Sequence, residues 1–374
     1  MRTIFLKRSY CHKFAKKLQL VAVFQFLQRE KPQDLKAPKG ICMYHVGIIG
    51  TGSYVPERIL TNHDLEKMVE TSDRWILERT GIRERRIAAE GETNVTMGRL
   101  ALGRAIENAR IDPSKIEMLV VGTNTTEPVW PSAAGHIAQL LHLPKNIPFF
   151  DLQAGCTGFN YSLAMAEQFV KSGQYKTVAV VGSDKLSAIT DYKDRNTCVL
   201  FGDGAGAVVL QRREKEGIIR SHLGGEYRWR DTLVLHKNGD NGLAFMRMEG
   251  KKVYAFAKRA MAESCLRVLD PEGKANPKEL CLLLDQVDRI IPHQANARII
   301  KSAAWELESR LDLPDGTVKS KMIVTIEKYG NNSTASIPLA LDESIREGSL
   351  RAGDLVILVG FGAGLTFGAN LVRL

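Results

Sequence analysis

The sequence predicts an α/β protein. After residue 42, short β-branched runs alternate with longer helical stretches, which is typical of sheets covered by helices. The chain has 374 residues, enough for two or three domains and a large core. Its 44% hydrophobic and 25% charged residues are ordinary globular values. These values argue against a disordered, collagen-like or coiled-coil protein, and no apolar run is long enough for a membrane span.

Residues 1–42 are a basic extension that we set apart from the fold. Ten lysines and arginines against two acidic residues give this segment +8 of the net charge of +10. The remaining chain is nearly neutral, so its charge gives no reason to expect a nucleic-acid partner. The segment does not resemble a secretory signal. Three hypotheses stay open: a tail or an upstream start, with the fold beginning at Met43; a targeting segment; and an amphipathic partner segment.

Two sets of strands are expected, one in each half of the chain. The first set is predicted at 46–49, 118–121, 149–152, 177–181 and 207–210. The second set is predicted at 218–221, 288–291, 355–359 and 365–372. Each set has a glycine-rich run near its end. We therefore expect two similarly built halves, 43–215 and 216–374.

Helices are expected between these strands. Thr93 is a suitable N-cap for a helix over 95–109, because a threonine hydroxyl can accept a backbone N–H of the first turn. The other helical stretches are 132–141, 157–171, 251–268, 295–311 and 336–347. The glycines at 202–206 lack the Lys-Ser/Thr of a phosphate-binding loop, so we expect a tight structural turn there.

Six cysteines are spread along the chain without a short-spaced pair. This spacing predicts neither a disulfide framework nor a zinc cluster, and it favours a reducing, cytoplasmic location. Cys156 differs from the others, because it follows a buried strand and precedes a helix. The positive end of a helix dipole lowers a thiol pKa, so Cys156 is a candidate nucleophile. A small buried core cysteine is the alternative.

His293 and Asn331 lie at two further junctions between a strand and a helix. His293 follows a buried strand, where α/β folds often place functional groups, although a structural histidine is an equal alternative. Asn331 belongs to the polar run 330–336, which could also be a capping loop. Together, the thiol, the imidazole and the amide provide a nucleophile and two groups that can donate hydrogen bonds.

From residue 44 to 374 the sequence resembles 3-oxoacyl-[acyl-carrier-protein] synthase III, a ketoacyl synthase of the thiolase superfamily. The resemblance rests on motif blocks that occur in the family's order. These blocks are Ile49-Gly50-Thr51-Gly52, Thr71-Ser72-Asp73-Arg74-Trp75, Ala154-Gly155-Cys156-Thr157-Gly158-Phe159, Phe201-Gly202-Asp203-Gly204-Ala205-Gly206, Pro292-His293-Gln294-Ala295-Asn296 and Gly330-Asn331-Asn332-Ser333.

The resemblance implies the thiolase fold, in which two pseudo-twofold-related halves with mixed five-stranded sheets form five layers. It implies a homodimer and a catalytic triad of Cys156, His293 and Asn331. An acyl-CoA, expected to be acetyl-CoA, would acylate the cysteine, and malonyl-ACP would lose CO₂ and attack the acyl group. The backbone N–H groups of Cys156 and Ala363 would form the oxyanion hole. Neither a metal nor another cofactor is expected.

The resemblance also assigns binding residues. Coenzyme A would contact Thr71, Trp75, Arg79, Arg195 and Asn296. The acyl pocket would contain Leu200, Phe201, Tyr254 and Phe361, and Trp130 of the partner subunit would close it. The acyl carrier protein would dock on Arg298, Lys252, Lys258 and Arg259.

Three other functions are weighed against this one. A related enzyme of polyketide or other secondary metabolism could load a different starter with the same triad. A degradative thiolase would need a second cysteine near the C-terminus, whereas the last cysteine is Cys281. A scaffold without activity would be expected to lose a triad member, and all three are present.

Overall fold

The computed structural model describes residues 43–374 except 216 and 238–243. The hypotheses about residues 1–42 concern residues outside this part. The stretch Met43–Leu374 forms one compact unit, and its proposed division near residue 215 stays a prediction. Among the described residues, no helix is long and apolar enough to cross a membrane.

The first sheet has five strands, as expected, in the order β1-β7-β6-β4-β5. These strands are β1 (His45–Tyr54), β4 (Met118–Gly122), β5 (Phe149–Leu152), β6 (Thr177–Lys185) and β7 (Asp203–Arg213). The sheet is mixed, because β4 runs parallel to β5 and β6 while β7 is antiparallel to β6 and β1. All five strands predicted for the first half are confirmed.

The second sheet has four strands in the described residues, not the expected five, in the order β11-β12-β13-β8. They are β8 (Ile218–Gly225), β11 (Arg289–Pro292), β12 (Leu355–Gly362) and β13 (Thr366–Arg373). The fifth position is reduced to one bridge between Ile290 and Met322. Pairing ends there because the next backbone donors, from Thr325 and Ile326, bond to the side chain of Gln294.

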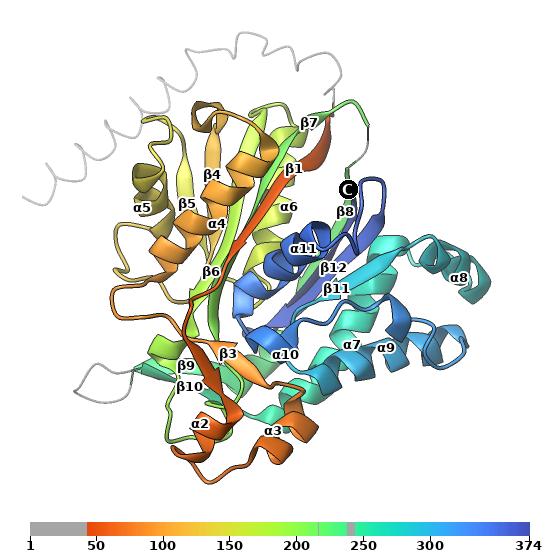
Figure 1. The fold of residues 1–374 in the computed structure, drawn as a ribbon. Helices are drawn as coiled ribbons and strands as arrows, with labels where there is room; N and C mark the ends of the chain where they lie inside the picture. The colour runs from red at the N-terminus through yellow and green to blue at the C-terminus, as the bar shows by residue number, and fades with distance from the viewer. Residues whose placement is uncertain (1–42, 216, 238–243) are drawn as a thin grey trace, which may run out of the picture. The chain divides into compact units, whose positions relative to one another are not determined.

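Helices and sheets alternate in five layers, which confirms the expected arrangement (Figure 1). The outer layer on the first sheet contains α4 (Asn94–Ala109) and α5 (Ala133–Leu140). The middle layer, between the two sheets, contains α6 (Gly158–Lys171) and α11 (Ser336–Arg346). The outer layer on the second sheet contains α7 (Gly250–Leu269), α8 (Pro277–Asp285) and α9 (Ala297–Leu311). The six predicted helices are confirmed, and Thr93 caps α4 as expected.

The alternation along the strands explains this layering. In β4, Val120 faces the middle layer while its neighbours Leu119 and Val121 face the outer helices. Both faces are therefore apolar, as expected for a sheet covered on both sides.

The turn predicted at 202–206 is wrong, because β7 begins at Asp203. Glycine is needed at 206, since a Cβ there would lie 2.7 Å from the backbone nitrogen of Leu339.

A smaller region, which we call the cap, lies at the lower edge of Figure 1 and was not predicted. It contains β2 (Ile59–Thr61), α2 (Asn62–Glu66), α3 (Asp73–Thr80), β3 (Glu84–Arg86), β9 (Leu233–Lys237) and β10 (Ala244–Met248). Its own apolar cluster includes Leu65, Ile76 and Phe201. The remaining short helices are η1 (Pro113–Lys115), η2 (Leu186–Ile189), η3 (Tyr227–Thr232), η4 (Lys319–Lys321), α10 (Ile326–Tyr329) and η5 (Ser333–Ala335).

Candidate active site

Cys156, His293 and Asn331 line one cavity of about 590 Å³. The walls of this cavity come from the cap and from the loops that precede α6, α9 and α11. The three side chains are separated by long stretches of sequence, and the two sheets bring them together. The structure thus places the predicted nucleophile and the two predicted donors around a single space.

Cys156 lies two residues before the start of α6, and Thr157 occupies the N-cap position. The half-buried thiol does not have the lowered pKa that the sequence predicted. Burial raises the pKa of Cys156 to about 12, whereas a hydrogen bond from the side chain of Ser333 lowers it. The prediction failed because removal of the charged sulfur from water outweighs the side-chain and backbone hydrogen bonds that lower the pKa.

His293 is fully buried, and burial lowers its pKa to about 3. The ring is therefore neutral at physiological pH. Its Nδ1 lies 2.7 Å from Oγ of Ser336, and this oxygen accepts the backbone N–H of Gln294 at 3.3 Å. Nε2 is buried without a partner among the described residues. The cavity therefore contains a neutral imidazole with one nitrogen available to a ligand.

The amide of Asn331 is oriented by its own loop. Its Oδ1 accepts the backbone N–H of Ser333 at 2.9 Å, so Nδ2 is the end left for the cavity. The backbone of Asn331 is held on both sides, because its N–H donates to Leu200 O at 2.9 Å and its carbonyl accepts from Gly202 at 3.0 Å. The asparagine can therefore donate a hydrogen bond to a ligand from a fixed position.

Two backbone segments meet beside the sulfur. A Cβ on Gly362 would lie 2.3 Å from the backbone nitrogen of Cys156, and a Cβ on Gly155 would lie 2.4 Å from that of Ala363. Gly155 has φ +56°, a conformation that favours glycine. Ala363 is not among the residues with positive φ, so its side chain is compatible with this position. The N–H groups of Cys156 and Ala363 are thus close neighbours.

The predicted acyl-pocket residues of this chain all line the cavity. These residues are Leu200, Phe201, Tyr254 and Phe361. The ring of Phe361 lies edge-on to that of His293, with centroids 5.5 Å apart. Sequence reasoning missed the wall formed by β9 and β10, which includes Leu233, Met246 and Met248. In the sequence, the apolar residues Met246 and Met248 alternate with the charged Arg247, and this alternation could have predicted strand β10.

The residues predicted for coenzyme A divide into two groups. Trp75, Arg79 and Asn296 line the cavity, whereas Thr71 and Arg195 lie outside its lining. Arg195 nevertheless lies over the indole of Trp75, with its guanidinium carbon 5.3 Å from the ring centroid. The side chain of Asn296 caps α9 and donates to Arg79 O at 3.1 Å.

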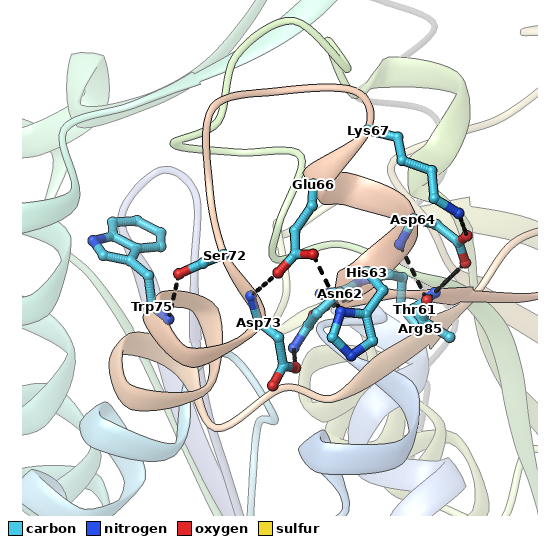
Figure 2. A network of polar contacts seen from close by, with 10 residues as sticks. All are labelled: Thr61, Asn62, His63, Asp64, Glu66, Lys67, Ser72, Asp73, Trp75 and Arg85. Atoms are coloured by element: carbon cyan, nitrogen blue, oxygen red, sulfur yellow. Dashed lines mark hydrogen bonds and ion pairs between the residues drawn. The ribbon is translucent and has the colours of Figure 1, made fainter.

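A polar network holds the helix that carries Trp75 (Figure 2). The amide of Asn62 donates to the carboxylate of Asp73, the first residue of α3, at 2.9 Å. Oδ1 of Asn62 in turn accepts from the guanidinium of Arg85 at 2.9 Å. Ser72 Oγ accepts the N–H of Trp75 at 3.2 Å. Since Arg85 also donates to Val199 O at 2.8 Å, the network joins α3 to a wall of the cavity.

Trp130 lies away from the cavity of its own chain. Its side chain is 87% exposed, and that of Val129 is 73% exposed. The loop that carries them leads into α5, whose first N–H groups, from Ala133 and Ala134, both donate to Asp151 on β5 at 2.8 Å. Trp130 is therefore exposed to solvent close to β5, the edge strand of the first sheet.

The predicted docking residues lie on α7 and α9, which pack together. Arg259 and Arg298 are exposed. Lys252 pairs with Glu249 at 2.7 Å, and Lys258 pairs with Glu306 at 3.5 Å. Two of the four predicted residues therefore already have acidic partners. Within the described part of the chain, no group of three or more His, Cys, Asp or Glu side chains could hold a metal ion.

Fold and site together define a condensing enzyme of the thiolase fold. Two family models match the chain, 3-oxoacyl-[acyl-carrier-protein (ACP)] synthase III over residues 150–226 and its C-terminal domain over residues 279–374. A β-ketoacyl-[acyl-carrier-protein] synthase III of Salmonella arizonae is 46% identical over 87% of this chain and 98% of its own length. The chain belongs to the 3-oxoacyl-[acyl-carrier-protein] synthase III family and is an acyltransferase.

Solved structures agree with this assignment. The 3-oxoacyl-[acyl-carrier-protein] synthase III of Aquifex aeolicus matches with a TM-score of 0.78 and 42% identity, over 88% of this chain and 100% of that one. A priming β-ketosynthase of the R1128 polyketide pathway matches with a TM-score of 0.80 and 33% identity, over 89% and 97%. A relative from Coxiella burnetii is 43% identical over 89% of this chain and 100% of its own length.

Proposed function

We propose that this enzyme condenses a short acyl-CoA with malonyl-ACP, giving 3-oxoacyl-ACP, CoA and CO₂, as the initiating step of fatty-acid synthesis. One observation carries the proposal: a single cavity contains a thiol, a neutral imidazole with a free Nε2 and an oriented amide. The family membership supports the choice of substrates.

The first half of the reaction is acyl transfer to Cys156. The thiolate attacks the thioester carbonyl of the acyl-CoA, and CoA leaves as the thiol after taking up a proton. The oxyanion that forms needs two donors close to the sulfur. The backbone N–H groups of Cys156 and Ala363 are proposed for this role, because the close approach of their segments places both groups beside Cys156.

The second half is decarboxylation followed by condensation. Loss of CO₂ from the malonyl group leaves an enolate whose charge lies on the thioester oxygen. Nε2–H of His293 and Nδ2–H of Asn331 are proposed to donate to that oxygen. The carbon of the enolate then attacks the acyl group on Cys156 and releases the sulfur. In this proposal the two hydrogen-bond donors stabilise the charge, so that no metal or other cofactor takes part.

The substrates are proposed to enter from the side of α3 and α9. The stacked pair of Trp75 and Arg195 suits the adenine of coenzyme A, since indole and guanidinium both pack against flat aromatic rings. Thr71, Arg79 and Asn296 are proposed as further contacts. Arg298 and Arg259, with Lys252 and Lys258 nearby, are proposed to attract the acidic carrier protein.

A homodimer is proposed from the edge of the first sheet. In the part of the chain that the structure describes, β5 pairs on one side only, with β4, and its Phe149 is 46% exposed. Exposed apolar edges are usually covered in native proteins. A second copy on this edge would cover Phe149 and place Trp130 of the partner subunit at the far end of the acyl pocket. The bulky indole would then restrict the primer to acetyl-CoA or to three- or four-carbon acyl groups.

A cytoplasmic location is proposed as well. Cys156, Cys198, Cys265 and Cys281 are free thiols, which is consistent with a reducing compartment. Microscopy of the chain fused to a fluorescent protein would test this location, and a signal confined to an organelle or the cell surface would contradict it.

The experiment that tests the function is exposure of the protein to a mixture of acyl-CoAs, followed by mass spectrometry of the peptide that contains Cys156. A short acyl group on this cysteine is expected. Malonyl-ACP should then remove it and yield 3-oxoacyl-ACP. If the cysteine stays unmodified in a folded sample, or if the acyl group is not passed to malonyl-ACP, the proposal is wrong.

A further inference from the structure

Two threonines that the proposed mechanism leaves unused connect the loop of Cys156 to the loop of Ala363. Thr157 directly follows the nucleophile and is fully buried. Thr366 is the first residue of β13 and lines the catalytic cavity. They lie 209 positions apart in the sequence, yet their hydroxyl oxygens are only 2.7 Å apart. The contact therefore links the two segments whose N–H groups are proposed as the oxyanion hole.

The carbonyl oxygen of Ala154 completes a triangle of oxygen atoms with these hydroxyls. It lies 2.6 Å from Oγ1 of Thr157 and 2.8 Å from Oγ1 of Thr366. The two hydroxyls supply two protons for the three sides of this triangle. Only the side between Thr157 and Ala154 lies within one segment. With both protons in the triangle, at least one hydrogen bond therefore joins Thr366 to the loop of Cys156.

A fourth contact does not change this conclusion. Oγ1 of Thr366 also lies 3.1 Å from the carbonyl oxygen of Ala363, in its own loop. Donation to this carbonyl would leave two of the shorter contacts in the triangle without a proton. Oxygen atoms less than 3 Å apart repel each other unless a proton lies between them, so the arrangement within the triangle is favoured.

The hydroxyl of Thr157 does not have the usual role of a threonine at its position. Thr157 is the N-cap of α6, where a hydroxyl ordinarily accepts a backbone N–H of the first turn. Within the described part of the chain, its side chain makes no such capping bond. It contacts Ala154 O and Thr366 instead. The contact between the two threonines is therefore not a consequence of helix capping.

The glycines of both segments explain why a side-chain contact is needed. A Cβ on Gly155 would lie 2.4 Å from the backbone nitrogen of Ala363, and a Cβ on Gly362 would lie 2.3 Å from that of Cys156. Glycine allows this close approach, but it also gives the backbone more conformational freedom. The proposed donors are backbone N–H groups of these same segments, so their relative position must be fixed by other interactions. The hydroxyl of Thr366 contacts both segments.

We propose that Thr366 is a positioning residue that holds the backbone N–H groups of Cys156 and Ala363 in the geometry that binds an oxyanion, and that Thr157 assists it. Donors of this kind are effective because they are in place before the charge develops. The inference rests on the proposed function, since it takes the two donors from it. It adds the side chains that keep these donors together.

The two threonines should contribute unequally. Both sides of the triangle that cross between the segments include Thr366. Thr366→Val therefore removes every crossing contact of the triangle while it keeps the shape of the side chain. Thr157→Val leaves the hydrogen bond from Thr366 to Ala154 O in place. We expect a large effect from the first variant and a smaller one from the second.

The experiment compares two reactions of the Cys156 sulfur. Acetyl-CoA and p-nitrophenyl acetate are attacked at a carbonyl carbon, whose oxygen becomes negative. The bond to the leaving group then breaks with its electron pair, and the thiol proton passes to the leaving group or to solvent. Iodoacetamide is attacked at a saturated carbon, from which the sulfur displaces iodide without forming an oxyanion. Mass spectrometry of the peptide that contains Cys156 measures both rates.

Thr366→Val should be acylated about tenfold more slowly by either acyl donor and alkylated at the parental rate. Complete loss of one oxyanion-hole donor costs roughly a hundred- to a thousandfold, and a displaced donor should cost less. Thr366→Ser keeps the hydroxyl and should restore acylation. Thr157→Val should slow acylation less than Thr366→Val does, and it should have little further effect when the two substitutions are combined.

Thr177→Val is the matched control. Thr177 is a buried threonine at the start of β6, and its hydroxyl accepts a hydrogen bond from Gln211 at 3.1 Å. This variant also replaces a buried hydroxyl by a methyl group, but at a position outside the cavity lining. Both of its rates should equal those of the parent. Thr366→Ala removes the same hydroxyl as Thr366→Val with a smaller side chain, and it replaces that variant if valine prevents folding.

Acylation of folded Thr366→Val at the parental rate would overturn the inference. Equal slowing of acylation and alkylation would also overturn it, because a general disturbance around the sulfur would affect both reactions. Failure of Thr366→Ser to restore acylation would have the same meaning. If acetyl-CoA does not acylate the parent, but p-nitrophenyl acetate does so with the expected dependence on Thr366, the proposed function is wrong and the inference is supported.

Discussion

The hydroxyl of Ser336 lies 2.7 Å from Nδ1 of His293 and determines which ring nitrogen carries the proton. Oγ of Ser336 accepts the backbone N–H of Gln294, and Nδ1 is the acceptor available to its own proton among the described residues. The proton of the neutral ring must then be on Nε2. His293 therefore presents a donor to the cavity, as stabilisation of an enolate oxygen requires.

Ser336→Ala should lower the rate of malonyl-ACP decarboxylation by about tenfold, since the hydrogen bond that selects the tautomer of His293 contributes roughly 1 kcal/mol. The ring would lose the contact that selects its tautomer. CO₂ release from malonyl-ACP measures the effect. Ser349→Ala changes an exposed serine just beyond α11 and should keep the parental rate. Equal rates in the two variants would contradict the assignment.

Cys156→Ala should keep decarboxylation but lose acyl transfer. His293 and Asn331 can stabilise the enolate without the sulfur, whereas the acyl group needs the thiol as its carrier. CO₂ release and formation of 3-oxoacyl-ACP measure the two halves separately. Cys156→Ser should also fold and lose condensation. Loss of both activities in a folded Cys156→Ala sample would show that the halves are not separable.

Burial of His293 should make the protein less stable in acid. Its pKa falls from the ordinary 6.5 to about 3 in the folded protein. Between these values the unfolded chain binds the proton more readily, so the free energy of unfolding should decrease as pH falls below about 6.5. His293→Gln should remove this contribution and flatten the dependence. Denaturant unfolding of both proteins across this range measures the difference, and parallel curves would contradict the prediction.

Trp130→Thr should shift the primer preference toward longer acyl chains. If the indole fills the end of the partner's pocket, its removal makes room for more CH₂ groups, and each buried group contributes ~0.8 kcal/mol. Condensation rates with acetyl-, octanoyl- and dodecanoyl-CoA measure the preference. Val129→Thr is the matched control, because Val129 is an exposed neighbour in the same loop. Efficient use of dodecanoyl-CoA by the unmodified enzyme would show that Trp130 does not close the pocket.

Asn62→Leu should weaken both stability and acyl-CoA binding. The substitution removes an acceptor from the buried guanidinium of Arg85 and a donor to Asp73, at a cost of roughly 1–3 kcal/mol. Because α3 carries Trp75, KM for acyl-CoA should rise while decarboxylation of malonyl-ACP changes little. His63→Ala is the control, since His63 is exposed and contacts only Glu66 in this network. An unchanged KM for acyl-CoA in Asn62→Leu would show that this polar network does not support acyl-CoA binding.

The layered core could be predicted because its strands and helices carry periodic apolar patterns. The predicted bounds of the strand Phe149–Leu152 match the observed ones, and Thr93 correctly indicated where α4 begins. The cap could not be predicted in this way. Its strand β2 has three residues, and its helices depend on local contacts such as the bond between Thr61 and Asp64. Ser72 and Gly81, which cap α3, were the signals available there.

The members of the site could be predicted more readily than their electrostatics. Cys156 and His293 each follow a strand and precede a helix, as predicted, whereas Asn331 lies between the short helices α10 and η5 and not at the predicted junction; all three line one cavity. The direction of the Cys156 pKa shift was predicted wrongly. Desolvation depends on the residues that surround a group in space, and these come from distant parts of the chain. The contact of Thr157 with Thr366 was hidden for the same reason.

The repeated strand order of the two sheets has an evolutionary consequence. By position, β4 corresponds to β11 and α6 corresponds to α11, so Asn124 and His293 occupy equivalent places after equivalent strands. A half-length ancestor would have needed two copies to enclose this cavity, with identical residues on each side. After fusion into one chain, the two copies could diverge. In the present chain, Cys156 belongs to the first of the two corresponding parts, whereas His293 and Asn331 both belong to the second.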